Sequence, residues 1–540
     1  MWKNFRVHPF PSEQLYRDLC QYLYKDQQRH LAVADHVAAI RSGRRPEESP
    51  PSQVETTPVI RLLAHEALAQ CKTVIFEDDY IDRDFFSEFS SFYSRCFKSY
   101  PSRCLRLHFL NVEMPSEADV SSSPKESYLG FAVLRPTESN SLGRTIILPP
   151  STNQGVNFIT CTASFSATIL GEEFKVQGMP FIQQDTQVGS CAHAALWMLA
   201  RYMAKHFHFR DFLPGEINSL AKAHIQLGRE YPSDKDGLTV AQMLDALRGM
   251  GFEPTHYEKS ALKSSTDGSA GRDFMDCPAS LVDEEAEDRI YTKRLAEIAY
   301  RYIESKLPVI FNLKDHAIVA IGHSYEWNVL QPSIATIDRI PSFFVHDDGV
   351  APYIELPILA KNPLTGVGFS DVKSIIAVTP KSASLSAEDA EARARIAIQQ
   401  FRNVVEAVTD AHNSQFPENN RLEFRTYLLP SIHFQQLLRR QSSSGVFHQE
   451  AARRLIQVDY PRFVWITEVT TSDLLRDPDK LRRQCLGRVI MDSTASKKAN
   501  SIIAIHFQDV LVVKDRQGKD PDFSAHYSRS TPVSQWFSAD

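Results

Sequence analysis

The 540-residue chain has no long apolar segment and no excess of positive charge. Its longest apolar stretches, such as 307–311 and 317–321, are far shorter than the ~20 residues that a membrane-spanning helix requires. Lysine and arginine together number 60 against 66 aspartate and glutamate residues, which gives a formal net charge of −6. We therefore expect no membrane insertion and no chain-wide basic surface of the kind that binds nucleic acid.

Cysteine is scarce, and its spacing lacks the pattern of a disulfide framework. The eight cysteines include no Cys-x-x-Cys pair, and scattered thiols in a chain of this length are typical of a reducing compartment. The first residues run into Pro9 and Pro11 without an apolar region, so they do not resemble a secretory signal. These features predict a cytoplasmic protein.

Signals for a cofactor or a metal are also missing. No glycine-rich phosphate loop followed by Lys-Ser or Lys-Thr is present, which disfavours an NTPase. His206 and His208 have an alternating spacing but no third ligand, and the spacing of Cys96, Cys104 and His108 matches no common structural zinc site. The sequence therefore predicts neither a metal nor an organic cofactor.

The composition is that of a folded protein with several domains. Hydrophobic residues make up 43% of the chain and charged residues 23%, which excludes wholesale disorder. Polar stretches interrupt the apolar pattern at 42–58, 259–288 and 380–386. They suggest an N-terminal unit over 1–155, a central unit over 156–379 and a C-terminal unit over 380–540.

The two flanking units show patterns of mixed α/β domains. In the N-terminal unit we expect strands over 72–76, 104–110, 128–135 and 143–148 and a helix over 83–97. In the C-terminal unit we expect strands over 422–428, 462–470 and 487–492 and a helix over 387–402. By analogy we expect these units to recruit substrate, contact a protein partner or regulate the central unit.

The central unit contains a cysteine at the predicted start of a buried helix. After Cys191, apolar residues recur at helical spacing up to Met203, and Gly189-Ser190 form a turn before it. Unpaired N–H groups and the positive end of the helix dipole favour a thiolate there, and can also face a developing oxyanion. The upstream Gln184 and Gln187 each offer a side-chain amide as a second donor.

A histidine and an acidic residue follow in two predicted strands. His316 begins a buried β pattern that ends at Gly322, and a second strand pattern ends at Asp347 and Asp348. If the two strands pair, alternation of side chains allows Asp347 to lie beside His316, where it would fix the imidazole tautomer and stabilise the imidazolium. His323 and His346 rank lower as the base because alternation places them on the opposite faces.

This ordered set of residues resembles the papain-like cysteine peptidases. The segments around His316 and Asp347 look most like the branch that processes double-glycine leader peptides in bacteria, and the resemblance covers residues 178–360. It implies an α+β fold in which a helix bearing Cys191 packs on an antiparallel sheet bearing the histidine and the acid. It also implies that Cys191 is the nucleophile, His316 the general base and acid, Asp347 the orienting residue and Gln184 the oxyanion-hole side chain.

The sequence departs from the family pattern in two places. Gln184 lies seven residues before the cysteine, where the family usually has six, so Gln187 remains an alternative. The interval from His316 to Asp347 is longer than usual, which implies an insertion around 326–339, and Asp348 is the alternative orienting residue.

The sequence thus predicts a cysteine-dependent hydrolase acting on a protein or peptide substrate through a Cys191 thioester. The same triad also serves transglutaminase-like acyl transfer or deamidation, so these activities remain open. A non-catalytic interaction protein that keeps the fold is the third alternative.

Overall fold

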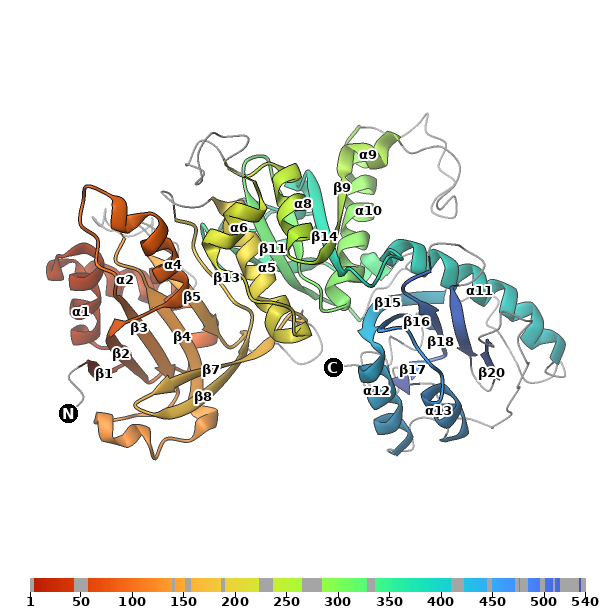
Figure 1. Cartoon of the computed structure of the whole chain (residues 1–540), viewed down its shortest axis with the longest axis horizontal. Coiled ribbons are helices and arrows are strands. Elements are labelled where there is room, and N and C mark those ends of the chain that lie inside the picture. Colours follow the sequence, from red (N-terminus) through yellow and green to blue (C-terminus); the bar gives the residue numbers. More distant parts are fainter. Residues whose placement is uncertain are drawn as a thin grey trace.

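The computed structural model describes most of the chain. The described residues are 4–42, 57–137, 141–150, 157–185, 190–222, 237–264, 284–327, 336–408, 422–443, 449–471, 475, 484–495, 501–507, 510–514 and 534–535. Gln187 and most of the polar stretch 42–58 lie outside these residues. Figure 1 shows three sheets side by side along the chain, the first in red and orange, the second mainly in green and the third in blue.

The N-terminal sheet is antiparallel throughout, in the order β1-β2-β3-β4-β5. Its strands are β1 (Phe5–Pro9), β2 (Thr73–Tyr80), β3 (Cys104–Leu110), β4 (Tyr128–Leu134) and β5 (Leu142–Ile147). One face packs against α1 (Glu13–Tyr24), α2 (His30–Arg41) and α3 (Pro58–Ala64). Helix α4 (Arg83–Ser91) lies towards the central unit, as Figure 1 shows.

The hairpin of β7 (Ala163–Ile169) and β8 (Glu172–Gly178) covers the other face of this sheet. Ile169 and Phe174 are buried in one cluster with Phe131 of the sheet. The hairpin therefore contributes to the N-terminal core, although its residues fall within the range 156–379 that the sequence assigns to the central unit.

The central sheet has the order β13-β12-β11-β10-β14-β9, with β6 paired to β11, and its pairings are antiparallel. Its strands are β6 (Asn157–Phe158), β9 (Phe252–Glu258), β10 (Val309–Asn312), β11 (Ala317–Ser324), β12 (Ser342–Asp347), β13 (Ala351–Pro357) and β14 (Ser374–Pro380). Its helices are α5 (Cys191–Phe207), α6 (Pro214–Leu220), α8 (Val240–Gly249), α9 (Lys259–Ser264) and α10 (Glu284–Glu304). The described fold is thus α+β with antiparallel sheets, the coarse class that the sequence predicts.

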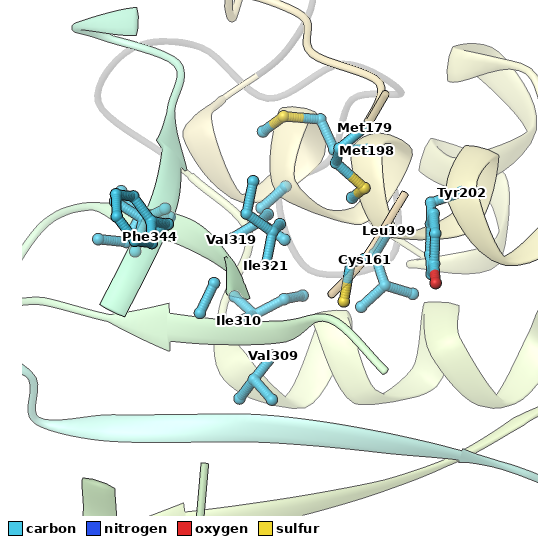
Figure 2. Close-up of a cluster of buried hydrophobic side chains, with 14 of the residues drawn as sticks. Cys161, Met179, Met198, Leu199, Tyr202, Val309, Ile310, Val319, Ile321 and Phe344 are labelled. Carbon is cyan, nitrogen blue, oxygen red and sulfur yellow. The ribbon is translucent and has the colours of Figure 1, made fainter. Parts of the chain in front are cut away.

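Helix α5 packs along the central sheet through a continuous apolar face. Figure 2 shows Met198, Leu199 and Tyr202 of this helix in one cluster with Val319 and Ile321 of β11, and all five side chains are buried. Tight packing of this kind leaves a helix little freedom to slide or rotate. It therefore fixes the N-terminus of α5 relative to the sheet.

The C-terminal sheet is also antiparallel, in the order β15-β16-β18-β19-β20. Its strands are β15 (Leu422–Pro430), β16 (Phe463–Thr471), β18 (Gly487–Asp492), β19 (Ile502–Phe507) and β20 (Val510–Val513). Helices α12 (Ser431–Ser443) and α13 (Gln449–Ile456) cover one face, and α11 (Ala387–Val408) contacts β15, β16 and β18. A further short pairing joins β17 (Gln484–Cys485) to β21 (Ser534–Gln535).

Buried ion pairs join the central and C-terminal units. Arg301 of α10 donates to Glu391 of α11 at 2.7 Å, and Arg339 donates to Glu423 of β15 at 2.7 Å. Glu304 at the end of α10 binds both His323 and Arg425, and all of these side chains are buried. The interface of the two units therefore contains compensated buried charge beside its apolar contacts.

Several predicted elements have their expected bounds, and others shift. The strands over 104–110 and 487–492 are confirmed, whereas the helix predicted over 83–97 ends at Ser91 and a 3₁₀ turn, Tyr93–Arg95, follows it. Within the described residues, no helix has both the length and the apolar character needed to cross a bilayer.

Candidate functional site

Cys191 is the first residue of α5. Ser190 precedes it in an extended conformation, and the carbonyl of Ser190 accepts the first helical bond, from the amide of Ala194 at 3.0 Å. The Cys191 side chain is half-buried, whereas most of the other described cysteines are fully buried. The helix thus presents this thiol beside its unpaired N-terminal amide groups, as the sequence predicts.

His316 lies at the turn that enters β11. The carbonyl of His316 accepts a bond from the amide of Leu313 at 2.8 Å, which closes the tight connection between β10 and β11. Strand β11 begins one residue after His316 and runs past Gly322 to Ser324, so it is one residue displaced from the predicted start and longer at its end. The imidazole remains 31% exposed and therefore accessible to a bound ligand.

Asp347 ends β12 and faces the His316 ring. Its Oδ1 accepts a bond from His316 Nε2 at 2.9 Å and another from the amide of Gly349 at 3.0 Å. The antiparallel pairing of β11 with β12 brings the two residues together from positions 31 apart in the sequence. The strand pairing that the sequence analysis assumed is confirmed.

The surroundings of His316 favour its charged form. Burial alone lowers the pKa of the imidazole, but hydrogen bonds to Asp347 and Cys191 and the charges of Asp347 and Asp348 outweigh it and raise the pKa to about 11. The ring therefore contacts the thiol of Cys191 as well as the carboxylate. Because the pKa is raised, the imidazolium persists through neutral pH and loses its proton only in alkaline solution.

Asp348 is buried close to the same ring. Its Oδ1 lies 3.7 Å from His316 Nε2, and its Oδ2 accepts a bond from the amide of Gln184 at 3.3 Å. Burial and the neighbouring charge of Asp347 raise the pKa of this carboxyl to about 7, against the lowering effect of His316. Asp347, with the shorter contact to the ring, is therefore better placed than Asp348 to orient it.

We expect Asp348→Asn to change how stability depends on pH. The pKa of Asp348 is raised from 3.8 to about 7. Between these values the folded protein holds a proton that the unfolded chain has released. The free energy of unfolding therefore falls as the pH rises from about 4 to about 7. Relative to the variant, the wild type should lose up to about 1.4 kcal/mol of unfolding free energy per pH unit over this window. Urea unfolding at several pH values measures the difference, and a difference independent of pH would contradict the expectation.

Gln184 lies in a segment without regular secondary structure beside the start of α5. Gln184 and Ser190 both line a small cavity of about 10 Å³, close to the space that one water molecule needs. The segment is thus brought to the N-terminus of α5, and the backbone amide of Gln184 donates to Asp348, which directly follows β12 of the central sheet. The alternative donor Gln187 lies outside the described residues.

The two lower-ranked histidines are held elsewhere. His346 is buried with its Nδ1 at 3.2 Å from the carbonyl of Pro180, and burial lowers its pKa to about 3. His323 is buried against Glu304 at the interface with the C-terminal unit. Neither ring has a contact with Cys191 among those described.

A metal ion is the alternative reading of the acidic residues. Across the described part of the chain, His316, Asp347 and Asp348 form the one group whose ligand atoms gather within 4.8 Å of one another. In this structure, however, His316 Nε2 bonds Asp347 directly and the ring also contacts Cys191. The arrangement therefore fits an oriented acid–base residue, and a chelator can test the metal alternative.

The structure also reveals residues near the site that the sequence analysis did not single out. Arg135 donates to the carbonyl of Gln183 at 2.9 Å, and Tyr93 donates to Asp185. These partners lie 48 and 92 positions apart in the sequence. No local pattern marks such contacts, because only the packing of two domains creates them.

The described part of the chain therefore brings together Cys191, His316 and Asp347, with Gln184 on the segment adjoining them. Comparison with protein-family models, with curated proteins and with solved structures found no match to this chain.

Proposed function

We propose that the protein is a cysteine-dependent hydrolase, most simply a papain-like peptidase that cleaves amide bonds. One observation carries the proposal: the His316 ring bonds Asp347 at 2.9 Å and also contacts the thiol of Cys191. A nucleophile, a base and a group that orients the base are the parts that covalent acyl chemistry requires. The Cys191 thiol and the His316 ring are both partly exposed, so a substrate can reach them.

The proposed reaction has two stages. The Cys191 thiolate attacks the amide carbonyl carbon, a C–S bond forms, and the carbonyl electrons move to oxygen, where the Cys191 amide and Gln184 stabilise the charge. The C–N bond then breaks as the His316 imidazolium gives its proton to the leaving amine. Water, deprotonated by His316, next attacks the thioester carbon, the C–S bond breaks, and the acid leaves while the Cys191 thiolate and the His316 imidazolium are regenerated.

Asp347 orients the ring during both stages. Because Asp347 bonds Nε2, Nδ1 is the ring atom that exchanges a proton with the thiol and the leaving group. The carboxylate fixes that tautomer and stabilises the imidazolium.

The test is to incubate the full chain with an unfolded protein and a fluorescent primary amine. We expect new amino termini, detected by mass spectrometry, that persist with a chelator and disappear after treatment with iodoacetamide. Incorporation of the amine into the protein would indicate an acyltransferase instead, and conversion of glutamine to glutamate a deamidase. Inhibition by the chelator would favour the metal alternative, and the absence of every product would favour a non-catalytic protein.

A further inference from the structure

Segment 181–185, which carries Gln184, is bound to the edge of the N-terminal sheet through an isolated β-bridge and neighbouring hydrogen bonds. Phe181 and Thr145 exchange two backbone bonds, of 2.8 and 2.9 Å. The amide of Gln183 donates to the carbonyl of Leu142 at 3.0 Å, and the amide of Leu142 donates to the Gln183 side chain at 3.1 Å. These bonds attach the segment to β5, the strand at the edge of the N-terminal sheet that is nearest the central sheet in Figure 1.

A buried charge cluster holds the end of the same segment. The Arg135 guanidinium donates to the carbonyl of Gln183 at 2.9 Å, lies 3.4 Å from a carboxylate oxygen of Glu88, and lies 3.9 Å from one of Asp185. Tyr93 donates its hydroxyl proton to Asp185. All of these side chains are at most 5% exposed. Loss of one partner would therefore leave a buried polar or charged group unpaired, which costs free energy of folding.

Neighbouring residues of the segment serve different partners. Gln183 and Asp185 are buried against the N-terminal domain, whereas Gln184 between them is only half-buried, and its backbone amide donates to Asp348, which follows β12 of the central sheet. Side chains alternate along an extended backbone. Contacts on one side of the segment therefore set the position of the residue on the other side.

We infer that Arg135 is a positioning residue for the candidate active site, holding segment 181–185 together with Tyr93 so that Gln184 can stabilise the oxyanion. The inference rests on the proposed function and assigns the N-terminal domain a part in it. Arg135 suits this role because its planar guanidinium can bind a backbone carbonyl and a carboxylate at once.

Two reactions of Cys191 separate positioning from general damage. Alkylation by iodoacetamide forms no oxyanion, whereas acylation by p-nitrophenyl acetate passes through one. In the full chain, we expect Arg135→Gln to slow acylation roughly 10- to 100-fold while alkylation stays close to the wild-type rate. Removing an oxyanion donor outright costs roughly 100- to 1000-fold, and displacing it costs less. Tyr93→Phe, which removes one hydroxyl, should lower the ratio of the two rates in the same direction but less.

The matched control is Arg106→Gln. Arg106 is also buried in the N-terminal sheet, but it bonds Glu77 and the carbonyl of Thr168 instead of segment 181–185. We expect its rate ratio to equal that of the wild type. Melting temperatures show which variants fold. If Arg135→Gln does not fold, the rate ratio of Tyr93→Phe tests the positioning role instead.

The outcomes distinguish the two proposals. An unchanged ratio in the folded variants, or an equal fall in both rates, would overturn the positioning role and leave the proposed function intact. If Cys191 of the wild type showed neither selective alkylation nor acylation, the proposed function would fail, and the positioning role with it.

Discussion

Cys191→Ala is expected to abolish turnover while leaving the fold intact. Removing the nucleophile of a covalent mechanism lowers the rate by a factor on the order of 10⁴ or more. The melting temperature should change little, because the Cys191 side chain is only half-buried at the first position of its helix and alanine is a strong helix former. Cleavage of an unfolded protein and thermal melting measure the two effects.

Cys96→Ala is the matched control for this variant. Cys96 is also half-buried, but it lies in the N-terminal unit, where its thiol contacts the carbonyl of Phe92. We expect full activity in this variant and none in Cys191→Ala. Turnover that survived the loss of Cys191 would show that another group is the nucleophile.

His316→Ala should be as damaging to turnover and should also change the reactivity of the thiol. The imidazolium that the raised pKa of His316 maintains at neutral pH would be lost, and an unassisted thiol ionises only near pH 8.5. At pH 7 the alkylation of Cys191 should therefore slow by roughly tenfold or more, and this deficit should shrink as the pH rises towards 9. Rates of iodoacetamide labelling across this pH range, mapped by peptide, give the profile.

Two comparisons sharpen this result. His256→Ala removes a partly buried histidine on β9, beside Glu258 and away from the site, and should leave labelling unchanged. Asp347→Asn keeps the shape of the orienting residue and should cost less than His316→Ala. If Asp348→Asn reduced turnover and Asp347→Asn did not, the orienting role would belong to Asp348.

Local patterns in the sequence located the parts of the candidate site that depend on one element at a time. Apolar spacing after Cys191 predicted the start of α5, and the strand pattern before Asp347 predicted β12. Alternation along paired strands allowed Asp347 to lie beside His316, and the structure contains this contact.

Features that depend on contacts between domains were not predictable in this way. The hairpin of β7 and β8 has ordinary strand patterns, and nothing in them indicates that it packs on the N-terminal sheet. Local sequence patterns likewise do not predict the bond from Arg135 to the carbonyl of Gln183, because any buried carbonyl could accept it. The early end of α4 has a similar cause, because the turn after Phe92 buries Tyr93, which bonds Asp185.

The ion pairs between α10 and the C-terminal unit bear on how the protein can be dissected. A fragment cut near residue 380 would leave Arg301, Arg339 and Glu304 without Glu391, Glu423 and Arg425, their buried partners. Such stranded charges typically cost several kcal/mol. Because α10 also packs against β11, the strand that follows His316, the excised central unit would not reproduce the structure of the intact chain. Inactivity of that fragment would therefore say nothing about the roles proposed for Cys191 and His316.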